Sequence, residues 1–413
     1  MSAARTEIAV IGAGVIGLTI ALRLARAGRE VVLIDPATPG SGASWGNAGT
    51  IADYAVLPVG TPSVLRNLPA LLLDRNSPLA IRRAALPALA PWLMRFLRQS
   101  LPAAARRNAQ ALAALNADAA ALWLSLAAEI GGEDLLNHNG CLYLYESQKD
   151  RAAAEADMAY RRGLGVTVDL VSADRLAQME PGLPPIAGGG AFFPQAIFLS
   201  DPGEMVARLA GAAQAAGARH ISARVTGLAR TPDGARLSGP GLALDARHAI
   251  IAAGAHSRML ARQAGDRIPL DTERGYHVEY DMAAPVLSRP ASPSSRGFYM
   301  CPMTGRLRVA GTVELGGLHA PPSPHRIARL DQGVRALFPD LPAPSRDWMG
   351  FRPSMPDSLP VIGPSRNGAE ILHAYGHGHI GLTLAPTTAR LIEAALAGRT
   401  PDEMAPCLPT RFP

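Results

Sequence analysis

The chain has 413 residues, which is too long for one ordinary hydrophobic core and predicts two domains. Its hydrophobic content of 48% is ample for burial, and its formal charge of +6 comes without a dense Lys/Arg block among aromatic residues, which excludes a nucleic-acid surface. No run of 18 uninterrupted apolar residues indicates a membrane span, and the apolar N-terminus lacks the basic segment of a signal peptide.

The first motif is a glycine-rich turn between a strand and a helix. Residues 8–17 have the sequence IAVIGAGVIG, and a helical run follows. Gly12 allows the tight turn, Gly14 lets backbone N–H groups approach a pyrophosphate, and Gly17 lets the helix pack against the strand. The positive end of the helix dipole then faces the phosphate charge. The motif predicts dinucleotide binding.

An acid and a loop extend this predicted site. Asp35 follows a second apolar strand at 31–34, where a carboxylate accepts hydrogen bonds from a ribose diol and disfavours the 2′-phosphate of NADP. Residues 36–49 are rich in Gly and Ser, and their stretch SGASWGNAG (41–49) can bring several N–H groups and hydroxyls to an extended ligand. The alternative is a flexible surface turn.

Residues 53–130 are rich in Ala, Leu, Pro and Arg and show helical periodicity over 79–99 and 103–130. The stretch 87–99 (PALAPWLMRFLRQ) mixes apolar and basic residues. Such a helix lies either on a membrane interface or against a core with a solvated arginine face, and the core helix is the simpler interpretation.

The rest of the chain alternates predicted strands and helices. An acid cap and a proline at the first helical position predict a helix that starts after Asp201. Further helices are expected after Lys149, over 323–338 and near the C-terminus up to 397. Strands are expected at 140–145, 220–228, 235–237, 242–245, 248–254, within 272–315 and at 371–375.

The reactive side chains set further limits. Cys141, Cys301 and Cys407 are isolated in sequence, which indicates thiols of a reducing, cytoplasmic compartment without disulfides or a cysteine metal site. His377 and His379 lie two residues apart, but no carboxylate-histidine cluster completes a metal site. Lys149 is the only lysine, so a lysine general base has one candidate.

Taken together, these motifs resemble the D-amino-acid oxidase superfamily of flavoproteins. The resemblance rests on GAGVIG with Asp35, SWGNAG (44–49), IIAAG (250–254), GFRP (350–353) and GHGHIGLT (376–383), and covers essentially the whole chain. Within the superfamily the chain is most similar to bacterial D-amino-acid dehydrogenases, which share an S-x-x-N-A-G loop and an Arg- and Pro-rich segment like 58–100.

The resemblance implies an α/β fold with a Rossmann-like FAD-binding domain and a substrate domain built on a mixed, largely antiparallel sheet. The FAD-binding domain is expected to be discontinuous, over 1–52, 200–258 and 346–413, with the substrate domain over 53–199 and 259–345. Some relatives attach the flavin to a cysteine near the position of Arg352; none lies there in this chain, so FAD is expected to be noncovalent. The expected FAD-binding residues are Gly12, Ala13, Gly14, Val15, Ile16, Gly17, Asp35, Pro36, Ser44, Asn47, Ala48, Gly49, Val225, Ala253, Gly254, Gly376, Gly378, His379, Ile380, Gly381, Leu382 and Thr383.

Substrate residues follow from chemistry and from the resemblance. The guanidinium of Arg352 is a planar, bidentate match to an α-carboxylate, and the Arg of the family's G-x-R-P segment holds that group. Tyr276 resembles the tyrosine that adds a hydroxyl to the same carboxylate, although a strand tyrosine is as often a packing residue. His379 is expected near the flavin, and Tyr54 and Tyr299 are weaker candidates for the pocket wall.

The predicted function is FAD-dependent oxidation of D-amino acids by hydride transfer to flavin. The absence of lysine near the flavin motifs favours a dehydrogenase that passes electrons to a quinone or another carrier. Alternatives are a cis-4-hydroxy-D-proline dehydrogenase, a flavin-carrying subunit active only in a heteromeric complex, and a pyridine-nucleotide-dependent reductase, which the single GxGxxG disfavours. Peripheral contact with the inner membrane also stays open.

Overall fold

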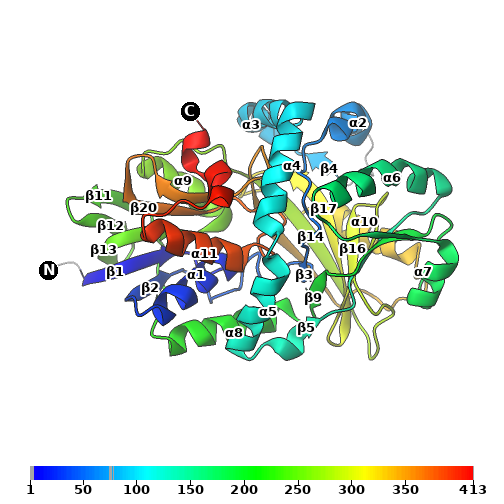
Figure 1. Cartoon of the computed structure of the whole chain (residues 1–413), viewed down its shortest axis with the longest axis horizontal. Helices are drawn as coiled ribbons and strands as arrows, with labels where there is room; N and C mark the ends of the chain where they lie inside the picture. Colours follow the sequence, from blue (N-terminus) through cyan, green and yellow to red (C-terminus); the bar gives the residue numbers. More distant parts are fainter. Residues whose placement is uncertain (1–3, 74–76, 78, 413) are drawn as a thin grey trace.

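The computed structural model describes residues 4–73, 77 and 79–412, and two large sheets organise it (Figure 1). Residues 1–3 and 413 of the predicted FAD-binding segments, and 74–76 and 78 of the predicted substrate domain, lie outside the described residues. The described part of the first sheet contains β1 (Ala4–Ile11), β2 (Val31–Ile34), β10 (Arg219–Ile221), β11 (Gly227–Thr231), β12 (Gly234–Gly239), β13 (Leu242–Ile251), β19 (Val361–Ser365) and β20 (Gly368–Tyr375).

The centre of the first sheet is parallel. Strands β10, β2, β1 and β13 lie in that order, and β20 pairs in parallel with the last residues of β13. Residues 8–11 and 31–34 are buried, as expected for parallel strands covered on both faces, which explains their uninterrupted apolar sequences. This arrangement confirms the predicted Rossmann-like unit.

Two of the strand predictions were wrong in detail. The predicted strand 220–228 is two strands, β10 and β11, which lie at opposite edges of the sheet and are separated by residues 222–226. The predicted strands 242–245 and 248–254 are one strand, β13, because its first half pairs with β12 and its end pairs with β20. Apolar periodicity shows neither the crossing nor the change of partner.

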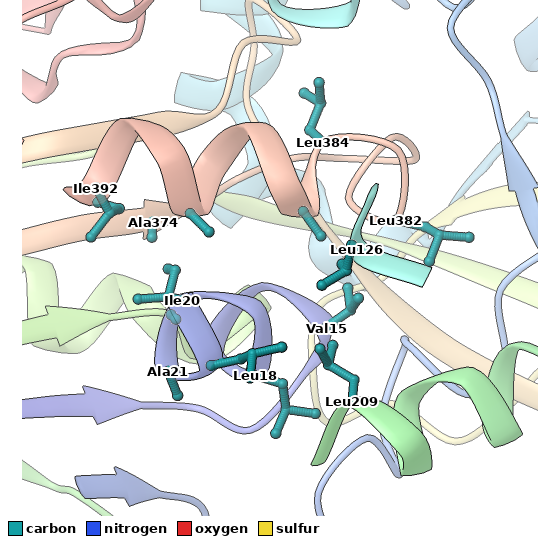
Figure 2. Close-up of a cluster of buried hydrophobic side chains, with 14 of the residues drawn as sticks. Val15, Leu18, Ile20, Ala21, Leu126, Leu209, Ala374, Leu382, Leu384 and Ile392 are labelled. Atoms are coloured by element: carbon teal, nitrogen blue, oxygen red, sulfur yellow. The ribbon is translucent and has the colours of Figure 1, made fainter. Parts of the chain in front are cut away.

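Helices cover the first sheet with an apolar layer. Here α1 (Val15–Arg26) packs between α8 (Pro202–Ala215) and α11 (Ala385–Leu396). Figure 2 shows their side chains meeting in one cluster, with Leu18 and Ile20 of α1 near Leu209 and Ile392. The start of α8 is as predicted, since the carboxylate of Asp201 accepts hydrogen bonds from two backbone N–H groups of its first turn.

The second sheet is mixed and mainly antiparallel, as predicted. Most of its pairs are antiparallel, while β6 with β15 and β4 with β17 are parallel. Its described strands are, in spatial order, β18 (Arg346–Ser354), β14 (Asp271–Asp281), β17 (Arg306–Leu315), β16 (Phe298–Met303), β15 (Ala291–Pro293), β6 (Cys141–Leu144), β8 (Gly190–Phe193) and β7 (Asp169–Val171), with β4 (Leu79–Ile81) beside β17. Helices α6 (Gln148–Gly163), α7 (Ala173–Met179) and α10 (Pro324–Arg335) accompany it, while α9 (Ser257–Gln263) packs against the first sheet.

The predicted domain boundary at residue 346 needs a correction. Strand β18 pairs with β14 from Asp271↔Ser354 to Glu279↔Arg346, so it belongs to the second sheet rather than to the first. The chain returns to the first sheet at β19. A small sheet of β3 (Thr50–Ile51), β9 (Ile197–Leu199) and β5 (Leu136–Asn137) follows the 36–49 loop.

The described part of residues 53–130 contains four α-helices: α2 (Pro62–Leu73), α3 (Leu86–Gln99), α4 (Pro102–Asn116) and α5 (Ala119–Ile130). The prediction of helix from residue 79 was wrong at its start, since 79–81 form β4 and extend the second sheet. The segment Pro102–Ile130 is long and apolar enough by length and composition to span a membrane. Its inner side packs in the protein, where the Trp123 indole N–H donates to the carbonyl of Leu382 at 2.8 Å.

Candidate active site

The glycine turn has no room for side chains. Gly12 has a φ of 111°, and a Cβ at this position would overlap the carbonyl of Ala252 at the end of β13. A Cβ at Gly17 would overlap the carbonyl oxygen of Gly12, so helix α1 sits directly on the turn. The three glycines therefore bring the start of α1 to the carboxyl ends of β1 and β13, where a doubly wound sheet binds its ligand.

The start of α1 is open to an anion. Its N-cap residue is Gly14, which offers no side-chain cap. The hydroxyl of Ser44 accepts the N–H of Val15 at 2.9 Å, while Ile16 is half-buried in the same turn. A Cβ at Gly14 would lie 3.2 Å from the Ser44 hydroxyl. The 36–49 loop thus closes over the start of the helix without blocking it.

Asp35 is held at the end of β2. One carboxylate oxygen accepts the N–H of Ala13 at 2.8 Å, and the other accepts the N–H of Ala37 at 2.9 Å, across Pro36. The residue is half-buried, so its remaining lone pairs can accept the hydroxyls of a ribose. Ala253 lies two residues after β13 and packs against the core cluster that contains the buried Val225, and Gly254 starts the short helical turn that follows.

The 36–49 loop is anchored to the second sheet through its backbone carbonyls. The Arg308 guanidinium donates to Trp45 O at 3.1 Å and to Asn47 O at 2.7 Å, and His277 Nδ1 lies 3.0 Å from Gly46 O. Arg308 and its ion-pair partner Glu279 are both fully buried. The Asn47 side chain donates to Ser44 O and accepts the N–H of Gly49, which shapes the turn around Ala48.

Sequence reasoning missed this anchor. Its members lie more than 200 residues from the loop and have no motif of their own. The alternation of β14, which places His277 and Glu279 on one face, was the available signal, but its use requires the register of the strands.

The GHGHIGLT segment lies against β18, as a loop that precedes α11. The N–H of Gly378 donates to the carbonyl of Pro353 at 2.7 Å, and His377 pairs with Ser354 in an isolated bridge. Gly376 and Gly378 both have positive φ. The loop is fixed further on, where the Thr383 hydroxyl accepts the N–H of Ala52, Ile380 and Leu382 enter the core, and Gly381 packs on His377.

Arg352 lies on the face of the second sheet that looks toward this loop. It is directly opposite Glu273 in the ladder of β18 and β14. A Cβ at Gly275 would lie 2.5 Å from the guanidinium carbon, so this glycine leaves the space that the arginine occupies. One N–H of Arg352 donates to the carbonyl of Thr312 at 2.9 Å. Thr312 sits in a β-bulge of β17 with a φ of 56°, and the bulge aims this carbonyl.

The other N–H groups of Arg352 have no acceptor among the residues that the structure describes. No carboxylate oxygen lies within 4 Å of its guanidinium in the described residues, and its side-chain nitrogens are not among the buried atoms that lack a partner. They therefore reach accessible space. Burial lowers the pKa of Arg352, although the charge of Glu273 opposes this, and the guanidinium stays charged. The geometry leaves a cation ready for an anionic ligand.

His379 lies within the electrostatic field of Arg352. Desolvation, together with the charges of Arg352 and Arg161, lowers its pKa to about 4. The imidazole is thus neutral at pH 7. The His379 side chain is exposed, and no described residue forms a hydrogen bond with its ring nitrogens. The structure brings His379 and Arg352 together.

Tyr276 does not join them. Along β14 it alternates with Glu273 and His277, so its ring lies on the opposite face, among the apolar side chains under α10. Its hydroxyl donates to Glu314 at 2.6 Å and accepts the N–H of Ser323 at 3.1 Å. The expectation that Tyr276 shares a carboxylate with Arg352 is therefore corrected: the alternation of the strand points it away.

The other two predicted tyrosines belong to one aromatic cluster. Tyr54 is buried, stacks on Phe193 with ring centroids 4.1 Å apart, and donates its hydroxyl to the thiol of Cys141. Tyr299 is half-buried, and its hydroxyl donates to that of Tyr143 at 3.0 Å. Tyr54 is thus a core residue, whereas Tyr299 and Tyr143 have accessible surface.

The three cysteines are buried and free. Burial raises the pKa of the Cys141 and Cys407 thiols to about 12, and raises that of Cys301 as well. In the part of the chain that the structure describes, no group of three or more His, Cys, Asp or Glu side chains could hold a metal ion.

Comparison with known proteins defines the class. Residues 7–395 match the family described as DAO, FAD dependent oxidoreductase, and the chain belongs to this family. It is therefore a flavin-dependent oxidoreductase with the two-sheet architecture of its relatives.

Individual relatives narrow the comparison. The chain is 39% identical to a D-amino-acid oxidase of Bradyrhizobium diazoefficiens over 98% of this chain and 99% of that protein. It is 30% identical to a D-amino acid dehydrogenase of Rhizorhabdus wittichii, over 96% and 97% of the two chains. A glycine oxidase structure from Geobacillus kaustophilus has a TM-score of 0.80 at 24% identity, over 99% of this chain and 100% of that one.

Proposed function

We propose that this enzyme oxidises the α-amino group of small D-amino acids. Bound FAD supplies the acceptor for the α-hydrogen, and water then hydrolyses the free imine to a 2-oxo acid and ammonia. The single observation that carries the proposal is the guanidinium of Arg352, with unpaired N–H groups in accessible space beside the GHGHIGLT loop. Membership of the FAD-dependent family and the names of the D-amino-acid relatives support it.

The FAD site that we infer follows the cradle described above. The pyrophosphate would lie on Gly12–Gly17 and the start of α1, and the ribose at Asp35. The segments Ser44–Gly49 and Gly376–Thr383 would contact the flavin ring. The fit rests on the uncapped start of α1 and on the absence of a Cβ at Gly14. The three buried cysteines support noncovalent binding, because their thiols are held inside the protein.

A substitution at Gly14 tests this placement. Gly14→Val places a branched side chain against Ser44 and over the start of α1, so the purified variant should lack FAD. Gly42→Val is the matched control, since its Cβ would meet nothing within 4 Å in the same loop. A Gly14→Val protein that keeps one FAD per chain would refute the placement.

The residues of this chain would orient the amino-acid substrate and form the wall of its pocket. Arg352 would hold the α-carboxylate by two parallel hydrogen bonds, which fixes the face that presents the α-hydrogen. The neutral His379 offers a ring nitrogen to the amino group without adding charge. Tyr299 and Tyr143 would form the wall with their paired hydroxyls.

We further propose that electrons pass to a quinone or another carrier rather than to O₂. The one lysine, Lys149, is exposed at the start of α6, so no lysine lies at the proposed site. Steady-state turnover with a D-amino acid should be faster with a soluble quinone analogue than with air alone. Equal rates with O₂ would make the enzyme an oxidase.

We also propose a peripheral contact with an anionic inner membrane, and two features of residues 79–117 support it. Residues 79–117 contain six arginines and no Asp or Glu, so this segment carries a local excess of positive charge. Leu86, Met94 and Leu101 are exposed in the same segment. Sedimentation with vesicles of phosphatidylglycerol, but not of phosphatidylcholine alone, would support the contact.

The experiment that tests the main proposal is anaerobic flavin reduction. The FAD-loaded enzyme is mixed with D- and L-amino acids, including both hydroxyproline series. Bleaching by D-amino acids only is the expected result, and the fastest substrate gives the substrate class. A flavin that no amino acid bleaches would overturn the proposal.

A further inference from the structure

A buried acid stands directly behind the proposed carboxylate clamp. Glu273 on β14 is opposite Arg352 on β18, on the same face of the sheet, and is 6% exposed. Its carboxylate is not within 4 Å of any basic nitrogen in the described residues, so it does not occupy the donors of Arg352. The proposed function gives Glu273 no role.

The surroundings of Glu273 contain a few charged side chains. On β14 itself, Asp271 lies on the same face and pairs with Arg258 of α9 at 3.8 Å. From β18, Arg352 and the hydroxyl of Ser354 face it. From the 376–383 loop, His377 and His379 are the titratable groups, and both are neutral at pH 7. Burial lowers the pKa of His377 to about 3, while desolvation and the charges of Arg352 and Arg161 lower that of the accessible His379 to about 4. On β17 its neighbour is the apolar Leu315, while Glu314 belongs to the other face, with Arg274.

These surroundings balance two opposing effects. Burial raises the pKa of Glu273, whereas the positive charge of Arg352 and the hydrogen bond from Ser354 favour its ionised form. An α-carboxylate on Arg352 would offset that positive charge and add a second anion beside Glu273. Two carboxylates close together in a buried site favour sharing a proton.

We propose that Glu273 takes up a proton from solvent when a carboxylate ligand binds Arg352, so that ligand binding and protonation of Glu273 are coupled. The proposal rests on the proposed function, because it uses Arg352 as the carboxylate site. The proton comes from water and returns to it when the product leaves, and no bond other than O–H is made or broken. Glu273 is a positioning residue, since it acts through Arg352.

The direction of the pH dependence follows from this coupling. Protonation of Glu273 favours the complex, so its pKa is higher in the complex than in the free enzyme. Carboxylate binding is therefore tightest at low pH and weakens as pH rises through the pKa of the free enzyme. Between the two pKa values the Kd increases by up to about tenfold per pH unit.

The test uses benzoate, a carboxylate that the flavin cannot oxidise, on the FAD-loaded enzyme. Its Kd is measured from flavin absorbance between about pH 5 and about pH 9, and proton uptake is measured with an indicator dye in weakly buffered solution. Wild type should take up as much as about one proton per bound benzoate, with a Kd that rises with pH. Glu273→Gln, which is permanently neutral, should bind benzoate with a flat pH profile and no proton uptake.

Two control variants separate the possible causes. Glu155→Gln makes the same change at an exposed site and should keep the wild-type profile. His379→Gln should also keep proton uptake, because the proposal assigns the proton to Glu273. If Glu273→Gln does not fold, wild type still decides, since absence of proton uptake overturns the coupling. Retention of the wild-type profile in Glu273→Gln also overturns it.

The proposed function has its own outcome in the same series. Benzoate that binds Arg352→Ala as tightly as wild type would show that Arg352 is not the carboxylate site, and both proposals would fail together. Loss of benzoate binding in Arg352→Ala, with an unchanged profile in Glu273→Gln, would remove the coupling alone.

Discussion

Two arginines on the same face of the second sheet have opposite surroundings. Arg308 is fully buried, with Glu279 as its ion-pair partner and two carbonyls of the 36–49 loop as acceptors. Arg352 donates to one carbonyl and has no carboxylate within 4 Å in the described part of the chain. The comparison shows that a buried arginine held by a carboxylate and two carbonyls anchors the fold, while a half-buried arginine with unused donors is available to a ligand.

Removal of Arg308 should have the largest effect on stability. Arg308→Ala removes one of three arginines that pair with the buried Glu279. Because Arg306 and Arg346 remain, the cost of this lost pair should lie below the cost of about 3–5 kcal/mol for a buried charge left without any partner. The 36–49 loop also loses its anchor, so the variant should melt at lower temperature and retain less FAD. Circular dichroism measures the melting temperature, and Arg236→Ala, which removes a surface ion pair with Asp245, is the control. An unchanged melting temperature would contradict the structural role.

Removal of Arg352 should affect kinetics instead. Each charge-assisted hydrogen bond contributes about 1.5–3 kcal/mol, so loss of a bidentate pair should lower kcat/KM by about 10²–10⁴-fold. Arg352→Ala should still bind FAD and melt close to wild type, because the side chain has one internal hydrogen bond. Rapid mixing measures the rate of flavin reduction. Wild-type kinetics in Arg352→Ala would show that the unused donors of Arg352 do not bind the substrate.

A methyl group beside Arg352 sharpens the comparison. Gly275→Ala puts a Cβ 2.5 Å from the guanidinium carbon and should push the arginine out of place. We expect kcat/KM to fall by roughly tenfold, the effect of a small misplacement. Gly211→Ala, where a Cβ meets nothing within 4 Å, is the control. Equal kinetics in both variants would show that Arg352 has freedom to move.

The smallest effect is expected on the other face of β14. Tyr276→Phe removes the hydroxyl that bonds Glu314, at a cost of about 1 kcal/mol in the free energy of unfolding. The kinetic constants for D-amino acids should not change, because the ring lies under α10. A rise in KM like that of the Arg352 variant would show that Tyr276 reaches the substrate after all.

Local chemistry explains which parts of the site were predictable from the sequence. Gly12, Gly14, Gly17 and Asp35 lie within one short strand-turn-helix-strand unit, so spacing alone predicts where they meet. The helix cap at Asp201 is local in the same way. Arg352 could be identified because its chemistry and the G-x-R-P pattern agreed.

The remaining features depend on register and on distant pairing. Tyr276 and Glu273 are three residues apart on β14 and so face opposite sides, but only the pairing of β14 with β18 shows that Arg352 lies on the side of Glu273. The ion pair of Arg308 with Glu279 and its bond to the loop join segments far apart in the chain. The bulge at Thr312 follows from the pairing of β17 with β14, which no local pattern reveals.

The buried thiols bear on how this protein tolerates its own chemistry. Reduced flavin that meets O₂ produces hydrogen peroxide, which attacks thiolates rather than thiols. All three cysteines are buried, and their raised pKa values keep them protonated at neutral pH. The enzyme therefore presents no easily oxidised sulfhydryl to a peroxide that escapes from its own active site, and cysteine oxidation should not limit its working lifetime.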